Sequence, residues 1–162
     1  MTLAATWNHA EWVLLQHVLL AFALSFAIGF EREIRGAPAG DRTYALVGTA
    51  AAAITAVAFD RSPQTVAGVV TGIGFVGAGM VFRGHEGMIK GVTSAATLLA
   101  VVAIGVVAGS GHGLLAVAVT AMLLIDLELR YIPVLRRLDA RRYVGMLRDD
   151  DAMPMGMDDA DS

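Results

Sequence analysis

Acidic and basic side chains cluster directly after the first apolar segment of the chain. The stretch GFEREIRG carries Glu31, Arg32, Glu33 and Arg35, and Arg42 follows a turn rich in glycine and proline. If the first helix continues through this stretch, Glu31 and Arg35 lie four positions apart with the acid first. That order is favourable for a helical ion pair.

Two kinds of chemistry suit this charged stretch. Glu31 could hold a hydrated Mg²⁺, because this ion binds proteins through one or two carboxylates and keeps several of its waters. The arginines instead suit ion pairs with these carboxylates or with the phosphates of anionic lipids. We favour pairing at a membrane interface over a metal site, because three cationic side chains oppose the binding of a bare cation.

Long apolar segments must position these charges. Hydrophobic residues make up 56% of the chain and charged residues 17%, whereas soluble domains carry about 25% charged residues. About 20 apolar residues in a helix cross the hydrocarbon core of a bilayer. We therefore predict an all-α integral membrane protein with five transmembrane helices, at residues 12–30, 43–59, 65–82, 92–108 and 113–132.

Lysine and arginine residues alternate between the two sides of these predicted spans. Three follow the first span, two follow the third and six follow residue 128. None precedes the first span, one follows the second and none follows the fourth. Cytoplasmic loops of membrane proteins carry the excess of basic residues. The pattern predicts a multi-pass protein of the bacterial inner membrane with its N-terminus outside and its C-terminus in the cytoplasm.

Small residues spaced four apart occur in the second, third and fourth spans. Helices in lipid associate through close backbone contact, which small side chains permit. We expect these three spans at the bundle centre. An alternative for residues 74–79 is a broken helix that lines a cavity, although the spacing favours packing. The glycines assigned to helix packing are Gly68, Gly72, Gly74, Gly77, Gly79, Gly105 and Gly109.

Few polar residues lie within the spans. Thr43, Thr93 and Thr97 either hydrogen-bond to their own helices or line a polar path, and the sequence leaves both alternatives open. Asp126 stands four positions before Arg130, which indicates an interfacial pair, but acids near the membrane are also candidates for function.

Catalytic motifs are not found in the sequence. It contains no nucleophile with a partner base, no paired-histidine motif and no phosphate-binding loop with its lysine. It also lacks cysteine, which excludes disulfides and thiolate metal sites. We therefore predict no enzymatic activity and no cofactor.

Three regions are expected along the chain. Residues 1–11 form an external segment, residues 12–132 the five-helix membrane domain, and residues 133–162 a cytoplasmic tail. The tail is basic in its first part and acidic in its second part, and its apolar residues do not recur at the spacing of a helix or a strand. This composition predicts disorder. About thirty residues do not build a substantial core.

The charged stretch and two later stretches, in this order, resemble the N-terminal membrane domain of the MgtC/SapB family. They are GFERE with RG and AGDRT between residues 29 and 43, the glycine-rich residues 72–79, and KGVTSAAT at residues 90–97. The resemblance covers most of residues 29–111. It implies as site candidates Glu31, Arg32, Arg35, Arg42, Gly77 and Thr93.

The resemblance implies a five-helix inner-membrane protein linked to growth in low magnesium and, in some pathogens, to virulence within macrophages. One prominent member inhibits the proton-driven ATP synthase. This chain departs from the family at Asp41, where an apolar residue is usual, and at Leu99, where tryptophan is common. Many members also carry a soluble cytoplasmic domain after the fifth helix, and any function of that domain does not carry over.

The sequence supports two functions of different kinds. The first is a regulatory protein linked to magnesium homeostasis, which docks its helices against another inner-membrane complex. The second is a transporter or channel for Mg²⁺ or another cation, with Glu31 and Asp126 lining a cytoplasmic vestibule. The expected partners are the lipid bilayer and that complex, with a homo-oligomer as an alternative and no nucleic acid.

Overall fold

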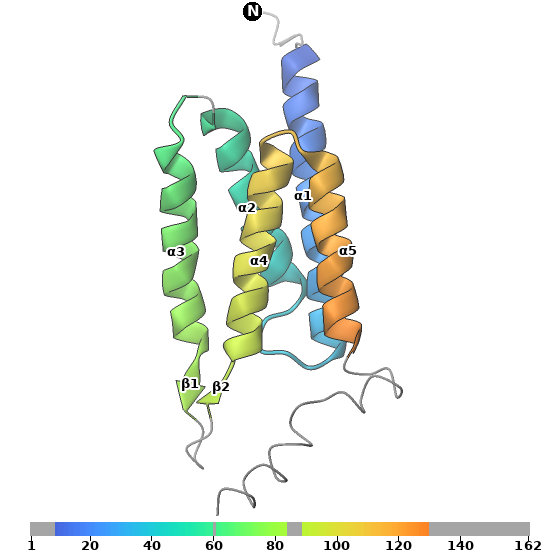
Figure 1. The fold of residues 1–162 in the computed structure, drawn as a ribbon, viewed down its shortest axis with the longest axis vertical. Coiled ribbons are helices and arrows are strands. Elements are labelled where there is room, and N and C mark those ends of the chain that lie inside the picture. The colour runs from blue at the N-terminus through green and yellow to red at the C-terminus, as the bar shows by residue number, and fades with distance from the viewer. Residues whose placement is uncertain (1–8, 60, 84–88, 130–162) are drawn as a thin grey trace, which may run out of the picture. The chain divides into compact units, whose positions relative to one another are not determined.

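The computed structural model shows a chain of helices joined by short turns (Figure 1). It describes residues 9–59, 61–83 and 89–129. The elements are α1 (His9–Ile34), α2 (Asp41–Ala58), α3 (Gln64–Met80), β1 (Phe82–Arg83), β2 (Ile89–Lys90), α4 (Val92–Gly109) and α5 (Gly113–Leu129). The predicted all-α class is confirmed for this described part, since the only strands in it are two residues long and pair antiparallel.

The five helices lie within a few residues of the five predicted segments. Two of the described helices, α1 and α4, are long and apolar enough to cross a membrane, and α3 is an apolar helix of 17 residues. The chain divides into two compact units, residues 1–124 and 125–162, at a boundary that lies within α5. Residues 84–88 and the predicted tail at 133–162 lie outside the described residues.

The core of the first unit lies where α1, α2 and α4 pack against one another. Helix α3 contacts mainly α4 (Figure 1). We had expected the second, third and fourth spans at the centre, but α1 occupies the place expected for α3. The buried apolar side chains at these contacts include Ala21, Ile28, Ala51, Ala52, Leu98, Val101 and Ile104.

Glycines allow the backbones of α2 and α4 to touch. A Cβ atom added to Gly105 would lie against the carbonyl oxygen of Gly48 and 2.9 Å from the Cβ of Ala51. One added to Gly109 would lie against the carbonyl oxygen of Ala52 and 2.9 Å from its Cα. The predicted packing role thus has a steric basis at Gly105 and Gly109.

The glycines of α3 have different surroundings. Among the described residues, no heavy atom of a neighbour lies within 4 Å of a Cβ added to Gly68, Gly72, Gly74 or Gly79. A Cβ on Gly77 would lie 3.7 Å from that of Ala95. In the described part of the chain, Gly77 is thus the one α3 glycine with such a neighbour, and the packing role predicted for the other four stays a prediction. Helix α3 runs unbroken from Gln64 to Met80, without the break that the cavity alternative required.

Candidate functional site

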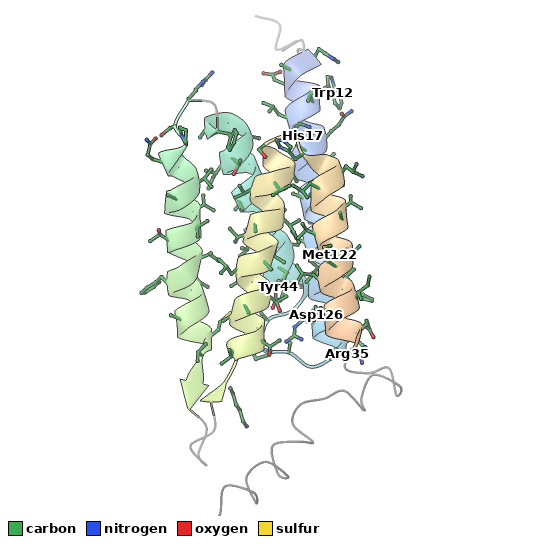
Figure 2. All side chains as sticks on the ribbon, viewed as in Figure 1. Trp12, His17, Arg35, Tyr44, Met122 and Asp126 are labelled. Carbon is green, nitrogen blue, oxygen red and sulfur yellow. The ribbon has the colours of Figure 1, made fainter. Side chains whose placement is uncertain are left out.

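The charged stretch lies where the turn between α1 and α2 meets the start of α4. We call this region the arginine end and define it by Arg32, Arg35 and Arg42. Helix α1 continues beyond the apolar segment to Ile34, as the ion-pair prediction required. Figure 2 shows Arg35 near this end of α1 and Trp12 near the other.

A glycine turn ends α1 and directs the chain into α2. The amide of Gly36 donates to the carbonyl of Glu33 at 2.9 Å, and the amide of Ala37 donates to the carbonyl of Arg32 at 3.0 Å. This pair of bonds with a left-handed residue is a Schellman motif. Gly36 has φ +66°, a conformation that glycine adopts without a steric penalty.

Glu33 caps the start of α2 from the preceding helix. Its Oε2 accepts a hydrogen bond of 3.0 Å from the backbone amide of Asp41. The N-cap residue of α2 is Gly40, which has no side chain to cap the helix itself. The carboxylate thus satisfies a first-turn amide that has no partner within its own helix.

Glu31 and Arg35 form the predicted ion pair. The Nε of Arg35 donates to Oε1 of Glu31 at 3.2 Å. The side chain of Glu31 is 10% exposed and that of Arg35 is 26% exposed. A carboxylate buried to this degree needs an opposite charge, and Arg35 supplies it.

Arg32, Ser94 and Tyr44 connect α1, α4 and α2. The Nη2 of Arg32 donates to Oγ of Ser94 at 3.2 Å, and the hydroxyl of Tyr44 donates to the carbonyl of Ser94 at 3.2 Å. Tyr44 is fully buried, and its position is labelled in Figure 2. The arginine end is therefore held by polar contacts among three helices.

Tyr44 was not predicted as a site residue, and Ser94 was predicted only as a hydroxyl that bonds to its own helix or lines a polar path. Ser94 lies within the KGVTSAAT stretch and Tyr44 directly follows AGDRT. Both positions therefore adjoin motif residues that were named. A buried tyrosine hydroxyl requires a hydrogen-bond partner, but the pairing joins residues fifty positions apart and no local spacing indicates it.

Two buried polar atoms at the arginine end have no hydrogen-bond partner in the described part of the chain. They are Oε2 of Glu31 and Nε of Arg32. Further from this end, the hydroxyls of Ser25 and Thr55 are also buried without a described partner. Within the described residues, no group of three or more histidine or acidic side chains is arranged to hold a metal ion.

The remaining predicted site residues take no part in the polar side-chain contacts described above. Arg42, Thr43 and Thr93 are exposed, and the amide of Arg42 donates to Oδ1 of Asp41. The hydroxyl of Thr97 donates to the carbonyl of Thr93 at 2.7 Å. Of the two alternatives for Thr97, a hydrogen bond to its own helix or a place on a polar path, the structure shows the first. Asp126 is exposed and belongs to the second compact unit, residues 125–162.

Helix α3 has two exposed features on different sides. At 100° per residue, Gly68, Gly72, Phe75 and Gly79 lie within about 60° of one another, and we call this the outer α3 face. Phe75 is 85% exposed on this face. Roughly opposite, an open apolar groove of about 330 Å³ lies between α3 and α4. This α3–α4 groove includes Gly74 and Leu99 among its lining residues.

A family model for the MgtC family matches residues 18–132. This chain belongs to the MgtC family. The matched range contains most of α1, all of α2 to α5 and the whole arginine end. The MgtC family resemblance noted in the sequence is thus confirmed.

Several relatives of known sequence are similar to this chain. Protein MgtC of Brucella abortus is 45% identical over 97 residues, which cover 56% of this chain and 40% of that protein. Protein MgtC of Salmonella typhimurium is 42% identical over 113 residues, covering 67% of this chain and 48% of the relative. An uncharacterized protein of Haemophilus influenzae is 31% identical over 143 residues, which cover 80% of this chain and 60% of that protein.

The chain spans about half the length of the curated relatives it matches. No solved structure matches it.

Proposed function

We propose that this member of the MgtC family is a multi-pass protein of the bacterial inner membrane. All five helices cross the bilayer, with the N-terminus outside and the C-terminus in the cytoplasm. The large apolar side chains left exposed on the helices support this placement, among them Leu19, Phe22, Phe30, Phe75 and Leu114. On α1, the exposed rings of Phe22, Phe26 and Phe30 stack in one row, and contiguous exposed apolar surface of this kind is unusual for a soluble monomer.

The distribution of basic residues supports the orientation. Arg32, Arg35 and Lys90 lie near the end where α1 finishes and α4 begins, and Arg61 lies in the turn between α2 and α3 at the opposite end of α2. Basic residues favour the cytoplasmic side of a membrane protein. The arginine end is therefore cytoplasmic in this proposal.

Within this membrane placement, the chain acts as a non-enzymatic regulator linked to magnesium homeostasis and adaptation to low magnesium. The link to magnesium comes from membership of the MgtC family and from the motifs that carry the resemblance. The regulator acts by docking against another inner-membrane complex.

The outer α3 face is the observation that carries this proposal. Gly68, Gly72 and Gly79 present backbone toward space that no described residue of the chain fills, on a face that also carries the exposed side chain of Phe75. Transmembrane helices approach one another closely where both present small residues. The face therefore suits a transmembrane helix of the partner complex.

The environment of Glu31 supports regulation over cation transport. Its Oε1 is paired with Arg35, and Arg32 occupies the next position in the chain. A carboxylate held by a protein cation in a largely buried setting is a weak ligand for a passing metal ion, because the cation must first be displaced. The pair instead fixes the cytoplasmic end of α1.

Cation transport is the second candidate, and one observation favours it. Oε2 of Glu31 is buried and accepts no hydrogen bond from the residues that the structure describes. An oxygen in this state has the capacity to bind a cation that enters from the arginine end. Glu31 would then be the first protein ligand on the path.

A flux measurement separates the two candidates. The purified chain is reconstituted into sealed liposomes that contain a Mg²⁺-sensitive dye, and empty liposomes provide the baseline. The regulator gives no flux above this baseline from helical, membrane-inserted protein. A transporter gives saturable flux that Glu31→Gln abolishes and Glu33→Gln preserves, because Glu33 caps α2 and takes no part in the Glu31–Arg35 pair. That result would refute the regulatory proposal.

A further inference from the structure

We propose that the α3–α4 groove binds one acyl chain of an anionic phospholipid of the inner leaflet, with the phosphate of the lipid beside Lys90. The inference rests on the membrane placement proposed above and adds a ligand to it. The groove is separate from the outer α3 face, which lies on the other side of α3.

The lining of the groove is apolar and includes several small residues. A Cβ atom added to Gly77 would lie 3.7 Å from that of Ala95, and Ala96, which also lines the groove, is exposed. Small side chains on both helices leave a depression that no described side chain fills. In a bilayer, lipid tails cover such apolar surface, because no water is present to do so.

The length of the groove favours a lipid over a transmembrane helix as its occupant. The groove extends along α3 from Val81 to Ile73 and along α4 from Val92 to Leu99. Eight residues of helix rise about 12 Å, and one leaflet of hydrocarbon is about 15 Å deep. The groove therefore ends within a single leaflet, whereas a transmembrane partner helix would require contact surface across both.

Charge at the mouth of the groove selects the headgroup. Lys90 is exposed and stands two residues before Val92, which lines the mouth. A basic residue near the membrane surface attracts an anionic lipid by about 1 kcal/mol. The positive end of the α4 helix dipole lies at the same place and adds to this attraction. Phosphatidylglycerol satisfies both requirements, with an apolar chain and a net negative headgroup.

Native mass spectrometry of the full chain in detergent tests the inference. Phosphatidylglycerol and phosphatidylcholine of matched chain length are titrated separately, and the dissociation constant of the first bound lipid is measured for each. The wild-type chain is expected to bind phosphatidylglycerol more tightly. Lys90→Gln should weaken phosphatidylglycerol binding by about fivefold, which corresponds to about 1 kcal/mol, and leave phosphatidylcholine binding unchanged.

Two matched controls test the position of the site. Arg61→Gln removes an exposed basic side chain at the opposite end of α2 and should leave lipid preference unchanged. Ala96→Leu fills the groove and should weaken binding of both lipids. Ala103→Leu adds the same bulk on the same side of α4, seven residues beyond Ala96. Ala103 does not line the α3–α4 groove, so this change should have no effect on the binding of either lipid. All of these positions are exposed, so folding is expected to survive.

Several results would overturn the inference. Equal affinity of the wild-type chain for the two lipids would do so, as would equal effects of Lys90→Gln and Arg61→Gln. A change in self-association with Ala96→Leu and no change in lipid binding would assign the groove to a second protein chain instead. Mg²⁺ flux by a chain that still prefers phosphatidylglycerol refutes only the regulatory function, whereas equal lipid affinities without flux refute only the lipid site.

Discussion

The α2–α4 contact and the outer α3 face carry the same sequence feature in opposite surroundings. Gly105 and Gly109 are four positions apart and press against the backbone of α2. Gly68 and Gly72 are also four positions apart, yet no described residue lies within 4 Å of a Cβ placed on either. Small-residue spacing therefore does not by itself show whether another helix of the same chain packs against the surface.

The largest expected effect comes from adding the same bulk to both regions. Gly105→Leu forces a side chain into the backbone of α2, and such overpacking costs about 3 kcal/mol or more. Gly72→Leu extends into open space and replaces glycine with a better helix former, so it should not lower stability. Thermal unfolding in detergent, followed by circular dichroism, measures both variants. Equal loss of stability in the two variants would remove the distinction between the regions.

The ion pair at the arginine end is expected to have the next largest effect. Glu31→Gln leaves Arg35 without its carboxylate and should cost about 1 to 3 kcal/mol, less than for a fully buried pair because Arg35 is partly exposed. Arg35→Gln should cost a similar amount, and the double variant less than the sum. Additive losses in this double-mutant cycle would mean that the two side chains do not stabilise each other.

Tyr44→Phe tests the polar contact between α2 and α4 at the arginine end. The change removes the hydrogen bond to the carbonyl of Ser94 but keeps the ring, and it should cost about 1 kcal/mol. Thermal unfolding of Tyr44→Phe and of the wild-type chain under the same conditions measures this difference in the free energy of unfolding. A stability equal to that of wild type would show that this bond does not hold α2 to α4.

Gly72→Ala should have an effect of up to this size and of the opposite sign. Alanine is favoured over glycine within a helix by about 1 kcal/mol, and no described residue obstructs its methyl group. Gly105→Ala should instead lower the melting temperature, because its Cβ would lie against Gly48. A lower melting temperature for Gly72→Ala would indicate that the outer α3 face is covered in the isolated protein.

Local patterns in the sequence were sufficient to predict the helices and one of the ion pairs. Runs of apolar residues located five helices, and the four-residue spacing of Glu31 and Arg35 predicted their contact. The turn rich in glycine and proline that follows Arg35 in the sequence coincides with the end of α1. Each of these features depends on neighbours within one or two turns, which the sequence displays directly.

Contacts between distant segments could not be predicted in the same way. Nothing in the spacing indicates that Tyr44 reaches Ser94 or that Glu33 caps α2 across the turn. The arrangement of the helices was also mispredicted, because a helix rich in glycine can be central or can keep its small-residue face for another molecule. Helix α1, with its large aromatic side chains on the exposed side, supplied the central contact instead.

Complementation in low magnesium tests the central claim, that the outer α3 face is where this regulator meets its partner. A bacterial strain lacking the gene is supplied with wild type, Gly72→Leu or the groove-side control Ala103→Leu, and membrane levels and growth are measured. The expected result is a normal membrane level of Gly72→Leu without growth in low magnesium, while Ala103→Leu supports growth. Normal growth with Gly72→Leu would contradict the claim.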